Sequence, residues 1–372
     1  MSAALIDLVS KGAQDVYITG QPEVSFFRQN YKRHTNFSIK PERIDYIGSF
    51  TSGAEVSIPI KSKGDLLSYV WIEAPGISAT GANNTGLFSS DSSPTEFLLY
   101  IGGQQVCRLD SLYVQGVHNV LYNETQARAS STVSTAEMKD NAKNNAGTAD
   151  SFVIPFFFSQ DWTKSLPLVA MQYHDVEIRI KCRDGTFSSS PKAYAMYAYL
   201  DTEERKFFTD KEHEILITQT QYQMVDSSAS DIDLTYFNHP TSALHLVSSN
   251  VSSGASAVAW DAAYTFDDAT LYINGTPLSE DMSSHYHHSV VPKMHCQNLP
   301  DNLLETAPVY TWPFCLNIGK SQPSGSLNFS RIDTAKVALR NVSGGNATQR
   351  MYAVNFNVLR VKDGLSGVAF GN

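Results

Sequence analysis

Val153–Ile180 reads VIPFFFSQDWTKSLPLVAMQYHDVEIRI, and a stretch of similar design recurs at Thr311–Leu339, TWPFCLNIGKSQPSGSLNFSRIDTAKVAL. Pro155-Phe156 in the first copy corresponds to Pro313-Phe314 in the second, an offset of 313 − 155 = 158 residues. Each copy has a proline–aromatic strand start, then a turn-rich gap, then a β-patterned strand. A repeat of this length is too long for a solenoid unit, so it predicts two similar domains in tandem.

Two further pairs of segments support the duplication. Leu99–Gly103 (LYIGG) corresponds to Leu271–Gly275 (LYING), an offset of 271 − 99 = 172 residues, and Val56–Tyr69 corresponds more loosely to Ile232–Leu246. Gly-Gly and Asn-Gly at matched positions predict hairpins with type I′ turns, which need positive φ at both central residues. The offset changes by 172 − 158 = 14 residues, and we assign the extra length to a long loop at Thr125–Ser151.

The pattern from Asp45 onward is that of β-strands. Val56, Ile58 and Ile60 alternate with polar residues, and Val176–Cys182 alternates in the same way with charged residues on its other face. Pro59 lacks an amide donor, which indicates an edge strand or a bulge. Each copy has about seven to nine such strands, a number typical of a sandwich or jelly roll. In the second copy they are expected at Ile215–Tyr222, Ile232–Phe237, Ala243–Val247, Val258–Phe266, Ala269–Ile273, Val309–Pro313, Val337–Arg340 and Tyr352–Val358.

Five segments are interpreted differently. Ala3–Lys11 is expected to form a short helix, and Asp15–Gly20 a short extended piece. A further helix is expected near Thr135–Lys143, inside the long loop. The highly charged segment Asp201–Asp210 lies at the midpoint of the duplication and is interpreted as the connection between the domains. Gly364–Asn372 is expected to be a glycine-rich tail.

Composition limits the possible functions. The net charge of −9 over 372 residues argues against a general nucleic-acid binder, whose affinity depends on a basic face. No apolar run approaches the ~18 residues of a membrane span, and the start MSAALIDLVSKG lacks the features of a signal peptide. We therefore expect assembly in the cytoplasm. The cysteines form no C-x-x-C pair and are interpreted as free thiols in a reducing compartment: Cys107, Cys182, Cys296 and Cys315.

The most basic segment is Ser25–Arg43. It contains five Lys and Arg residues and one glutamate, so its net charge is +4 when His34 is counted as neutral. One interpretation is contact with an anionic partner such as nucleic acid, lipid headgroups or an acidic patch. The alternative is a solvated or inter-subunit face whose interleaved aromatic residues belong to the core: Phe26, Phe27, Tyr31 and Phe37.

No catalytic constellation stands out, and we predict no catalytic, cofactor-binding or metal-binding residues. The best metal candidate is His285-x-His287-His288, with His295 and Cys296 nearby, since alternating residues on a strand would face the same way. No partner spacing completes a recognised zinc site, so a surface or interface cluster is preferred. Asp231-x-Asp233 and Asp267-Asp268 could bind calcium but are better explained as strand ends.

Eight asparagines lie in N-x-Ser/Thr sequons, which mark N-glycosylation in secreted proteins. Without a secretory signal, chance in an Asn- and Ser-rich chain is the simpler explanation. We retain six as candidate glycosylation sites: Asn83, Asn123, Asn250, Asn274, Asn341 and Asn346. The other two are Asn36 and Asn328.

Several segments resemble the major capsid proteins of nucleocytoplasmic large DNA viruses, including algal viruses and iridoviruses. They are GAQDVYITGQPEVSFFRQNYKRHTNF (Gly12–Phe37), LPLVAMQYHDVEIRI (Leu166–Ile180), LDTEERKFF (Leu200–Phe208), FNHP (Phe237–Pro240), LNFSRID (Leu327–Asp333) and NVLRVKDGLSGVAF (Asn357–Phe370). The resemblance spans nearly the whole chain. It implies an all-β fold of two tandem eight-stranded antiparallel jelly rolls with a short N-terminal arm. We expect the arm at residues 1–24, the first jelly roll at 25–210 and the second at 211–372.

The resemblance also implies a structural, non-enzymatic role in the virion. Three copies would form a homotrimer whose 3 × 2 = 6 jelly rolls make a pseudo-hexagonal capsomer of an icosahedral shell. The arm would lie at the capsomer base, contacting neighbouring capsomers, minor capsid proteins or an internal membrane. Outer loops, Thr125–Ser151 among them, could contact the host surface, and no specific nucleic acid is expected. Two alternatives remain: a minor-capsid paralogue, suggested by the short chain, and a glycan-binding or glycan-processing protein on paired jelly rolls.

Overall fold

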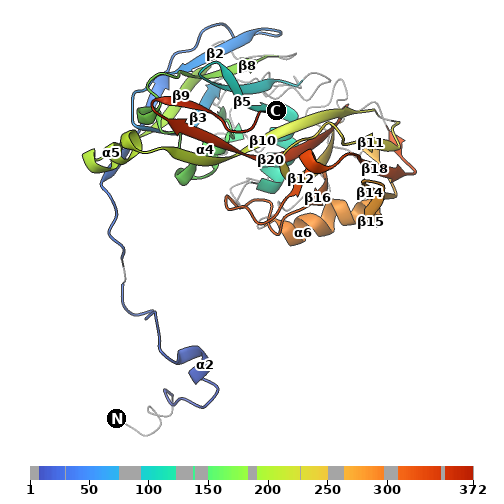
Figure 1. Cartoon of the computed structure of the whole chain (residues 1–372), viewed down its shortest axis with the longest axis horizontal. Coiled ribbons are helices and arrows are strands. Elements are labelled where there is room, and N and C mark those ends of the chain that lie inside the picture. The colour runs from blue at the N-terminus through green and yellow to red at the C-terminus, as the bar shows by residue number, and fades with distance from the viewer. Residues whose placement is uncertain are drawn as a thin grey trace. The chain divides into compact units, whose positions relative to one another are not determined.

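The computed structural model describes residues 8–29, 31–74, 94–122, 137–138, 150–182, 191–226, 228–249, 264–296, 309–344 and 348–371. The chain divides into two units, Met1–Asn36 and Phe37–Asn372 (Figure 1). We call the first unit the arm and the second the body. No helix in these ranges has the length and hydropathy needed to cross a bilayer.

The described part of the arm contains one short helix, α2 (Val16–Thr19). The prediction of an extended piece over Asp15–Gly20 is therefore wrong. The amide of Thr19 donates to the carbonyl oxygen of Asp15 at 2.8 Å, and its hydroxyl donates to the same oxygen at 2.7 Å. These local bonds give hydrogen-bond partners to backbone groups that pair with no strand among the described residues of the arm. Leu8–Lys11, the described end of the helix expected at Ala3–Lys11, is not helical.

The first half of the body consists of two antiparallel sheets. Their strand orders are β1-β9-β3-β7-β6 and β2-β8-β4-β5. The strands are β1 (Phe37–Ile44), β2 (Glu55–Ile60), β3 (Leu66–Ala74), β4 (Glu96–Ile101), β5 (Gln104–Asp110), β6 (Glu137–Met138), β7 (Asp150–Val153), β8 (Val176–Lys181) and β9 (Lys192–Leu200).

The second half repeats this design, with sheets ordered β10-β20-β12-β16 and β11-β18-β14-β15. Strand β21 pairs with β20, β17 with β12, and β13 with β19. The strands are β10 (His213–Val225), β11 (Asp231–Asp233), β12 (Pro240–Ser249), β13 (Tyr264–Thr265), β14 (Asp268–Ile273), β15 (Thr276–Ser283), β16 (Val309–Pro313), β17 (Leu327–Asn328), β18 (Ala335–Arg340), β19 (Ser343–Gly344), β20 (Thr348–Lys362) and β21 (Leu365–Val368).

The two halves have the same topology. When the eight main strands of each half are numbered along the chain, both halves have one sheet ordered 1-8-3-6 and one ordered 2-7-4-5. This is a jelly roll, in which two four-stranded sheets face each other. The predicted double jelly roll is confirmed. We call the half before α5 the first box and the half after it the second box; the boundary at residues 210 and 211 stays a prediction.

Short helices fill the connections between strands. In each box a helical segment follows the hairpin formed by the fourth and fifth main strands. The π-helical segments are η2 (Val114–Tyr122) and η6 (Tyr286–Val290), and the 3₁₀ segments are η4 (Trp162–Lys164), η5 (Leu168–Ala170) and η7 (Phe329–Arg331). The α-helices of the body are α3 (Ser111–Tyr113), α4 (Phe157–Gln160), α5 (Thr202–Asp210) and α6 (Val291–His295).

Both predicted hairpins are present. Gly102 and Gly103 have φ of 57° and 80°, and Asn274 and Gly275 have φ of 48° and 77°. These positive values at both central positions are those of the predicted type I′ turn. The alternation of β2 and β8 is also confirmed, since Val56, Ile58 and Ile60 and their counterparts on β8 are buried while the residues between them are not. Pro59 lies on β2, an edge strand of its sheet.

Three other predictions need correction. The β pattern was predicted only from Asp45 onward, but Phe37–Ile44 already forms the strand β1. Its pairing with β9 stabilises an extended backbone in spite of the basic composition of this segment. Glu137–Met138 pairs with β7 and is not helical, and the rest of Thr135–Lys143 lies outside the described residues. Asp201–Asp210 is not among them: it runs between β9 and β10 and is largely the helix α5, capped by the side chain of Asp201, and its interpretation as the connection between the domains stays a prediction. The tail at Gly364–Asn372 contains β21.

The strands predicted in the second copy are otherwise found, with different ends. Strand β11 stops at Asp233, because the side chain of Asp233 accepts the amide of Thr235 at 2.9 Å and forms a turn. The expected strand Val258–Phe266 is described only from Tyr264. The expected loop Thr125–Ser151 lies mostly outside the described residues.

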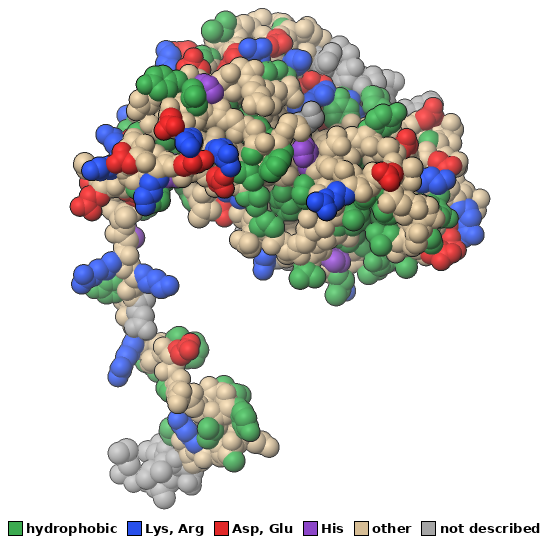
Figure 2. All heavy atoms as spheres, in the orientation of Figure 1, with side chains coloured by type: hydrophobic (Ala, Val, Ile, Leu, Met, Phe, Trp, Pro, Cys, Tyr) green, Lys and Arg blue, Asp and Glu red, His purple; other side chains and the backbone are tan. Residues whose placement is uncertain are grey.

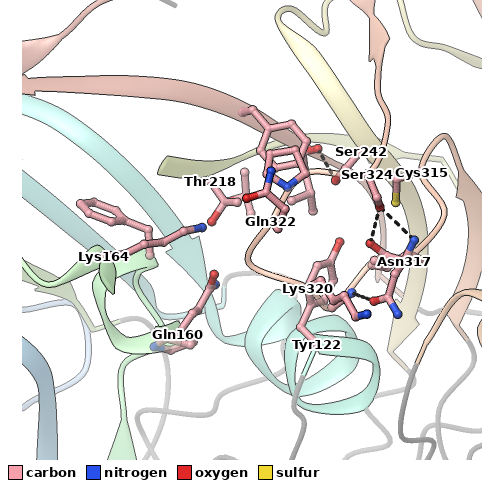
Figure 3. A pocket seen from close by; sticks show the side chains of 18 of the residues that line it. Tyr122, Gln160, Lys164, Thr218, Ser242, Cys315, Asn317, Lys320, Gln322 and Ser324 are labelled. Carbon is pink, nitrogen blue, oxygen red and sulfur yellow. Dashed lines mark hydrogen bonds between the residues drawn. The ribbon is translucent and has the colours of Figure 1, made fainter. Parts of the chain in front are cut away.

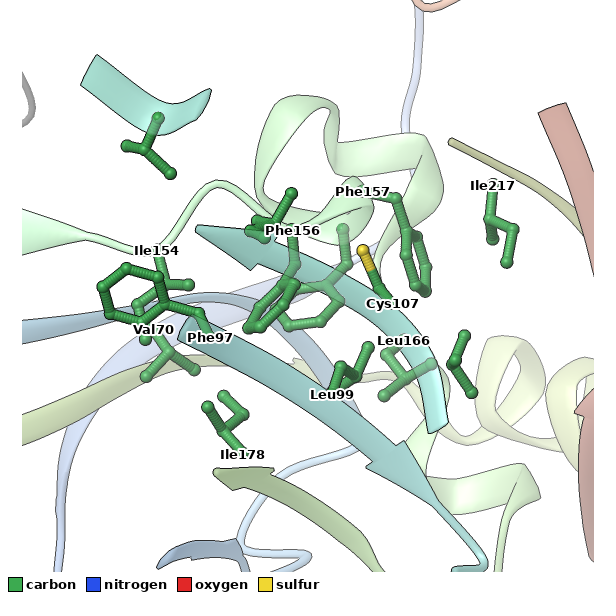
Figure 4. Packing of buried hydrophobic residues seen from close by; sticks show 14 of the residues in the cluster. Val70, Phe97, Leu99, Cys107, Ile154, Phe156, Phe157, Leu166, Ile178 and Ile217 are labelled. Carbon is green, nitrogen blue, oxygen red and sulfur yellow. The ribbon is translucent and has the colours of Figure 1, made fainter. Parts of the chain in front are cut away.

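The body has two buried apolar clusters. The first core fills the first box, and Figure 4 shows its aromatic centre, with Ile217 of β10 alongside Phe157 and Cys107. The second core lies between the two sheets of the second box. All four cysteines are free and buried, which confirms the free-thiol interpretation, and burial raises the pKa of Cys107 to about 12.

Candidate functional site

The sheet β10-β20-β12-β16 is buried on both faces and joins the two boxes. On β20, Tyr352 and Val354 belong to the first core, whereas Met351 and Ala353 belong to the second. Strand β12 alternates in the same way between the two clusters. Because successive side chains of a strand point to opposite faces, this sheet is a shared wall between the boxes. Separating the boxes would expose one apolar face of the wall.

A buried ion pair crosses from the first box to the wall. The carboxylate of Asp110, at the end of β5, accepts from Arg350 at 2.8 Å and from the hydroxyl of Tyr352 at 2.7 Å. It also accepts the amide of Tyr113 at 2.7 Å and so caps α3. Asp110 and Arg350 are only 2% and 4% exposed. Burial raises the pKa of Asp110, and the charge of Arg350 and the three donors oppose that rise.

A second set of contacts covers the free edge of β5, an edge strand of its sheet. The side chain of Gln219 donates to the carbonyl oxygen of Val106 at 2.6 Å, and the hydroxyl of Thr220 donates to that of Arg108. The guanidinium of Arg108 lies 4.6 Å from the ring centre of Tyr222. Side chains of the second box thus occupy acceptors that an open edge would present to another chain. We call these contacts and the Asp110–Arg350 pair the box junction.

The box junction is not apparent from the sequence. Asp110 and Arg350 lie 240 residues apart, so no local pattern connects them. One local feature of the sequence does point to a strand of this kind: Met351–Val354 is a continuous apolar run within a strand predicted to alternate. Such runs are typical of strands buried on both faces.

The histidine candidates lie in helical segments rather than on a strand, so the expectation that His285 and His287 face the same way is wrong. The Nδ1 of His287 lies 3.1 Å from the carbonyl oxygen of Thr311, and its ring lies 4.4 Å from that of Trp312. Since a carbonyl only accepts, Nδ1 carries the proton. Burial lowers the pKa of His287 to about 4.

The remaining members of the histidine group contact other partners. His288 faces the ring of Tyr310, and the Nδ1 of His295 lies 2.9 Å from the carbonyl oxygen of Cys315. Cys296 is buried. Within the described ranges, no three His, Cys, Asp or Glu side chains are grouped as a metal ion requires.

The acidic pairs occur at strand ends, as predicted. Asp231 begins β11 and pairs with Lys336 at 3.3 Å. Asp268 begins β14 and pairs with Arg340. Asp267 accepts from the side-chain amide of Asn341 at 2.7 Å. Strand termination accounts for these carboxylates.

Two candidate glycosylation sites lie among the described residues. Asn274 is exposed in the β14–β15 turn, and its Oδ1 accepts the amides of Asp333 and Thr334, each at 3.1 Å. Asn341 is exposed too, but its Nδ2, the atom that would carry a glycan, donates to Asp267. Glycosylation stays a prediction. The other four candidates lie outside the described residues: Asn83, Asn123, Asn250 and Asn346.

The basic segment Ser25–Arg43 divides between the arm and β1. Phe26 and Phe27 are 95% and 99% exposed in the arm of the single chain, and the interpretation of this segment as an inter-subunit face stays a prediction. Figure 2 shows hydrophobic and basic side chains along the arm. So many exposed aromatic residues in one segment indicate an interaction surface.

Comparisons with known proteins agree with this architecture. The family model for the N-terminal part of major capsid proteins matches residues 25–236, and that for large eukaryotic DNA virus major capsid proteins matches residues 204–367. The major capsid protein of Pyramimonas orientalis virus is 31% identical over 407 aligned residues, which cover 100% of both chains. That of Paramecium bursaria Chlorella virus 1 is 28% identical, also over 100% of both chains.

Solved structures support the fold. A chain in the quasi-atomic model of the PBCV-1 virus capsid matches with a TM-score of 0.76 and 25% identity, covering 94% of this chain and all of that one. The Faustovirus major capsid protein matches with a TM-score of 0.67 at 10% identity, covering 95% of each chain. The double box, the two family models and full-length relatives together place this chain in the major capsid protein family of large eukaryotic DNA viruses.

Proposed function

We propose that this capsid protein forms a homotrimer whose six boxes build a pseudo-hexagonal capsomer of an icosahedral virion shell. The observation that carries the proposal is the repetition of one strand order in two boxes with a shared wall. Two similar boxes per chain give a threefold object six similar sides. Neighbouring capsomers can then pack hexagonally without a separate protein for each side.

The box junction supports this role because a tile needs fixed angles between its sides. A flexible linker between boxes would allow them to move, and apolar and ionic contacts across the wall oppose that. The trimer interface of such an obligate assembly would bury roughly 2,000–5,000 Å².

We propose that the arm contacts neighbouring capsomers, minor capsid proteins or an internal membrane. Its exposed Phe26 and Phe27 beside Arg28 suit a partner with both apolar and anionic groups. Assembly in the host cytoplasm, contact of outer loops with the host surface and absence of catalysis belong to the same proposal. The alternatives from the sequence remain a minor-capsid paralogue and a glycan-binding or glycan-processing protein.

The test is the mass of the purified protein by size-exclusion chromatography with light scattering. A stable particle of three times 41.0 kDa is expected. Deleting residues 1–20 should preserve that mass and impair assembly beyond the trimer. If the full-length protein is a monomer, or a monomer that hydrolyses glycans, the shell function is contradicted. If only the protein lacking residues 1–20 is a monomer, the role given to the arm is contradicted.

A further inference from the structure

A cavity opens between the two boxes beside the shared wall. It has a volume of about 30 Å³, which is room for about two waters or one small ion. Figure 3 shows its polar lining, which includes Gln160 and Lys164 of the first box and Lys320 and Gln322 of the second. Thr218 of β10 also contributes to the lining. The cavity is too small for a sugar ring or a nucleotide base.

The charge of the lining has one sign. Two lysines line the cavity, and its other polar side chains are amides, hydroxyls and the thiols of Cys107 and Cys315. None of the lining residues that the structure describes is Asp or Glu. Amide and hydroxyl groups can donate to an anion, whereas a cation would need carboxylate or carbonyl ligands that compete with the two ammonium groups.

Lys164 is the central feature of the cavity. Lys164 is only 6% exposed. Figure 3 shows its ammonium directed toward Thr218 and Gln322. Among the described residues no carboxylate forms an ion pair with it, and Asp161 attracts it without a hydrogen bond between them. Burial lowers the pKa of Lys164, and the attraction of Asp161 opposes this. A buried ammonium without an ion-pair partner is costly, and an anion in the cavity would supply the missing charge.

Both copies of the duplicated stretch contribute to this cavity. Gln160 and Lys164 follow Pro155 in the first copy, and Lys320 and Gln322 follow Pro313 in the second. Each box thus supplies one lysine and one glutamine. The first box places Lys164 at depth, while Lys320 and Gln322 are exposed at the mouth.

We propose that this cavity binds one small oxyanion of the phosphate class, held by Lys164 at depth and by Lys320 and Gln322 at the mouth. Charge-assisted hydrogen bonds from both boxes would converge on its oxygens. The bound anion would hold the duplicated segments of the two boxes together. Either a free oxyanion or the phosphate of a larger molecule that stays outside the mouth could supply this chemistry.

The test is calorimetric titration of the full-length protein with inorganic phosphate, at constant ionic strength set with sodium chloride. Lys164→Met keeps an apolar stem and removes the charge, and we expect it to weaken phosphate binding about tenfold or more. Lys192→Met is the matched control, since Lys192 is exposed at the start of β9 and does not line the cavity, and should bind within twofold of the parent. Lys320→Met and Gln322→Ala alter only exposed side chains and should each weaken binding about threefold.

Thermal unfolding separates the site from a general effect on folding. Without phosphate, Lys164→Met should unfold at the same temperature as the parent or higher, because a buried charge has been removed. With saturating phosphate the order should reverse, because only the parent gains binding energy. A lower unfolding temperature for the variant in both conditions, with phosphate affinity unchanged, would overturn the proposal.

Glycerol 1-phosphate distinguishes the two sources of the anion. Binding as tight as that of inorganic phosphate assigns the site to a phosphate carried on a larger molecule, and binding only of phosphate and sulfate assigns it to a free oxyanion. Absence of binding by all three, or equal binding to the parent and to both lysine variants of the cavity, would refute the site.

Discussion

Replacing Arg350 by Met tests whether the buried ion pair holds the box junction. The change removes the charge that faces Asp110 at 2.8 Å, while the carboxylate stays 2% exposed. Two donors remain, the hydroxyl of Tyr352 and the amide of Tyr113. Removing one partner of a buried pair leaves an uncompensated charge, which costs about 3–5 kcal/mol. We expect Arg350→Met to lower the free energy of unfolding by that amount.

The double variant Asp110→Asn/Arg350→Met provides the critical comparison. Asparagine retains an oxygen that can accept from Tyr113 and Tyr352, and no buried charge remains. We therefore expect the double variant to lose only about 1–2 kcal/mol, less than either single variant. Asp110→Asn alone should resemble Arg350→Met, because the guanidinium would be left buried against Tyr222.

Arg360→Met is the matched control on the same strand. Arg360 pairs with Glu214 at 2.7 Å, but both side chains are more than half exposed. Exposed pairs contribute little to stability, because water screens their charges. The assay is guanidinium denaturation followed by tryptophan fluorescence at one fixed protein concentration, since assembly makes stability concentration-dependent. If Arg350→Met costs no more than Arg360→Met, or if the double variant costs the sum of the single changes, the ion pair does not hold the junction.

Three further predictions follow from other parts of the body. Burial lowers the pKa of His245 to about 3, so as pH falls below about 6.5 only the unfolded state takes up the proton. The free energy of unfolding should therefore drop by about 2 kcal/mol at pH 5. His245→Asn should remove this part of the acid sensitivity in denaturation curves recorded between pH 5 and 8. Gly102→Ala should lower the free energy of unfolding by about 1–3 kcal/mol, because its Cβ would lie 2.5 Å from the ring of His174. The Cβ of Gly103→Ala would meet nothing within 4 Å, so that variant should lose only about 1 kcal/mol through the strain of its positive φ. Equal losses of stability for the two variants would contradict this. A fragment of residues 37–210 should aggregate or bind a dye for exposed apolar surface, because the wall that completes its core is missing, and a soluble, cooperatively unfolding fragment would show that the boxes are independent.

The parts of the fold that follow from local chemistry could be predicted. Gly102-Gly103 and Asn274-Gly275 specify their turns through backbone sterics alone, and period-two burial locates β2 and β8. The repeat of Pro155-Phe156 at Pro313-Phe314 indicated two similar units, although both pairs lie at or just after the ends of strands, β7 and β16, and not at strand starts as predicted. These features depend on neighbours in the chain, so the sequence contains them directly.

Other features depend on tertiary context. The helix α5 is an exception, since it has a local signal in the sequence: Asp201 caps it, and Glu203 and Glu204 lie in its first turn. The strand β1 had no such signal, since its residues are mostly exposed and only pairing with β9 defines it. The cavity requires Lys164 and Lys320, which lie 320 − 164 = 156 residues apart, to meet, and spacing along the chain cannot indicate that.

The most direct test of the central claim is a cryo-electron microscopy map of the purified protein or the particle it forms. The shared wall and the repeated strand order predict a threefold capsomer with six box-shaped densities, two of them joined in each chain through one doubly buried sheet. A map with one box per chain, or with the two boxes of a chain at varying angles, would contradict the account.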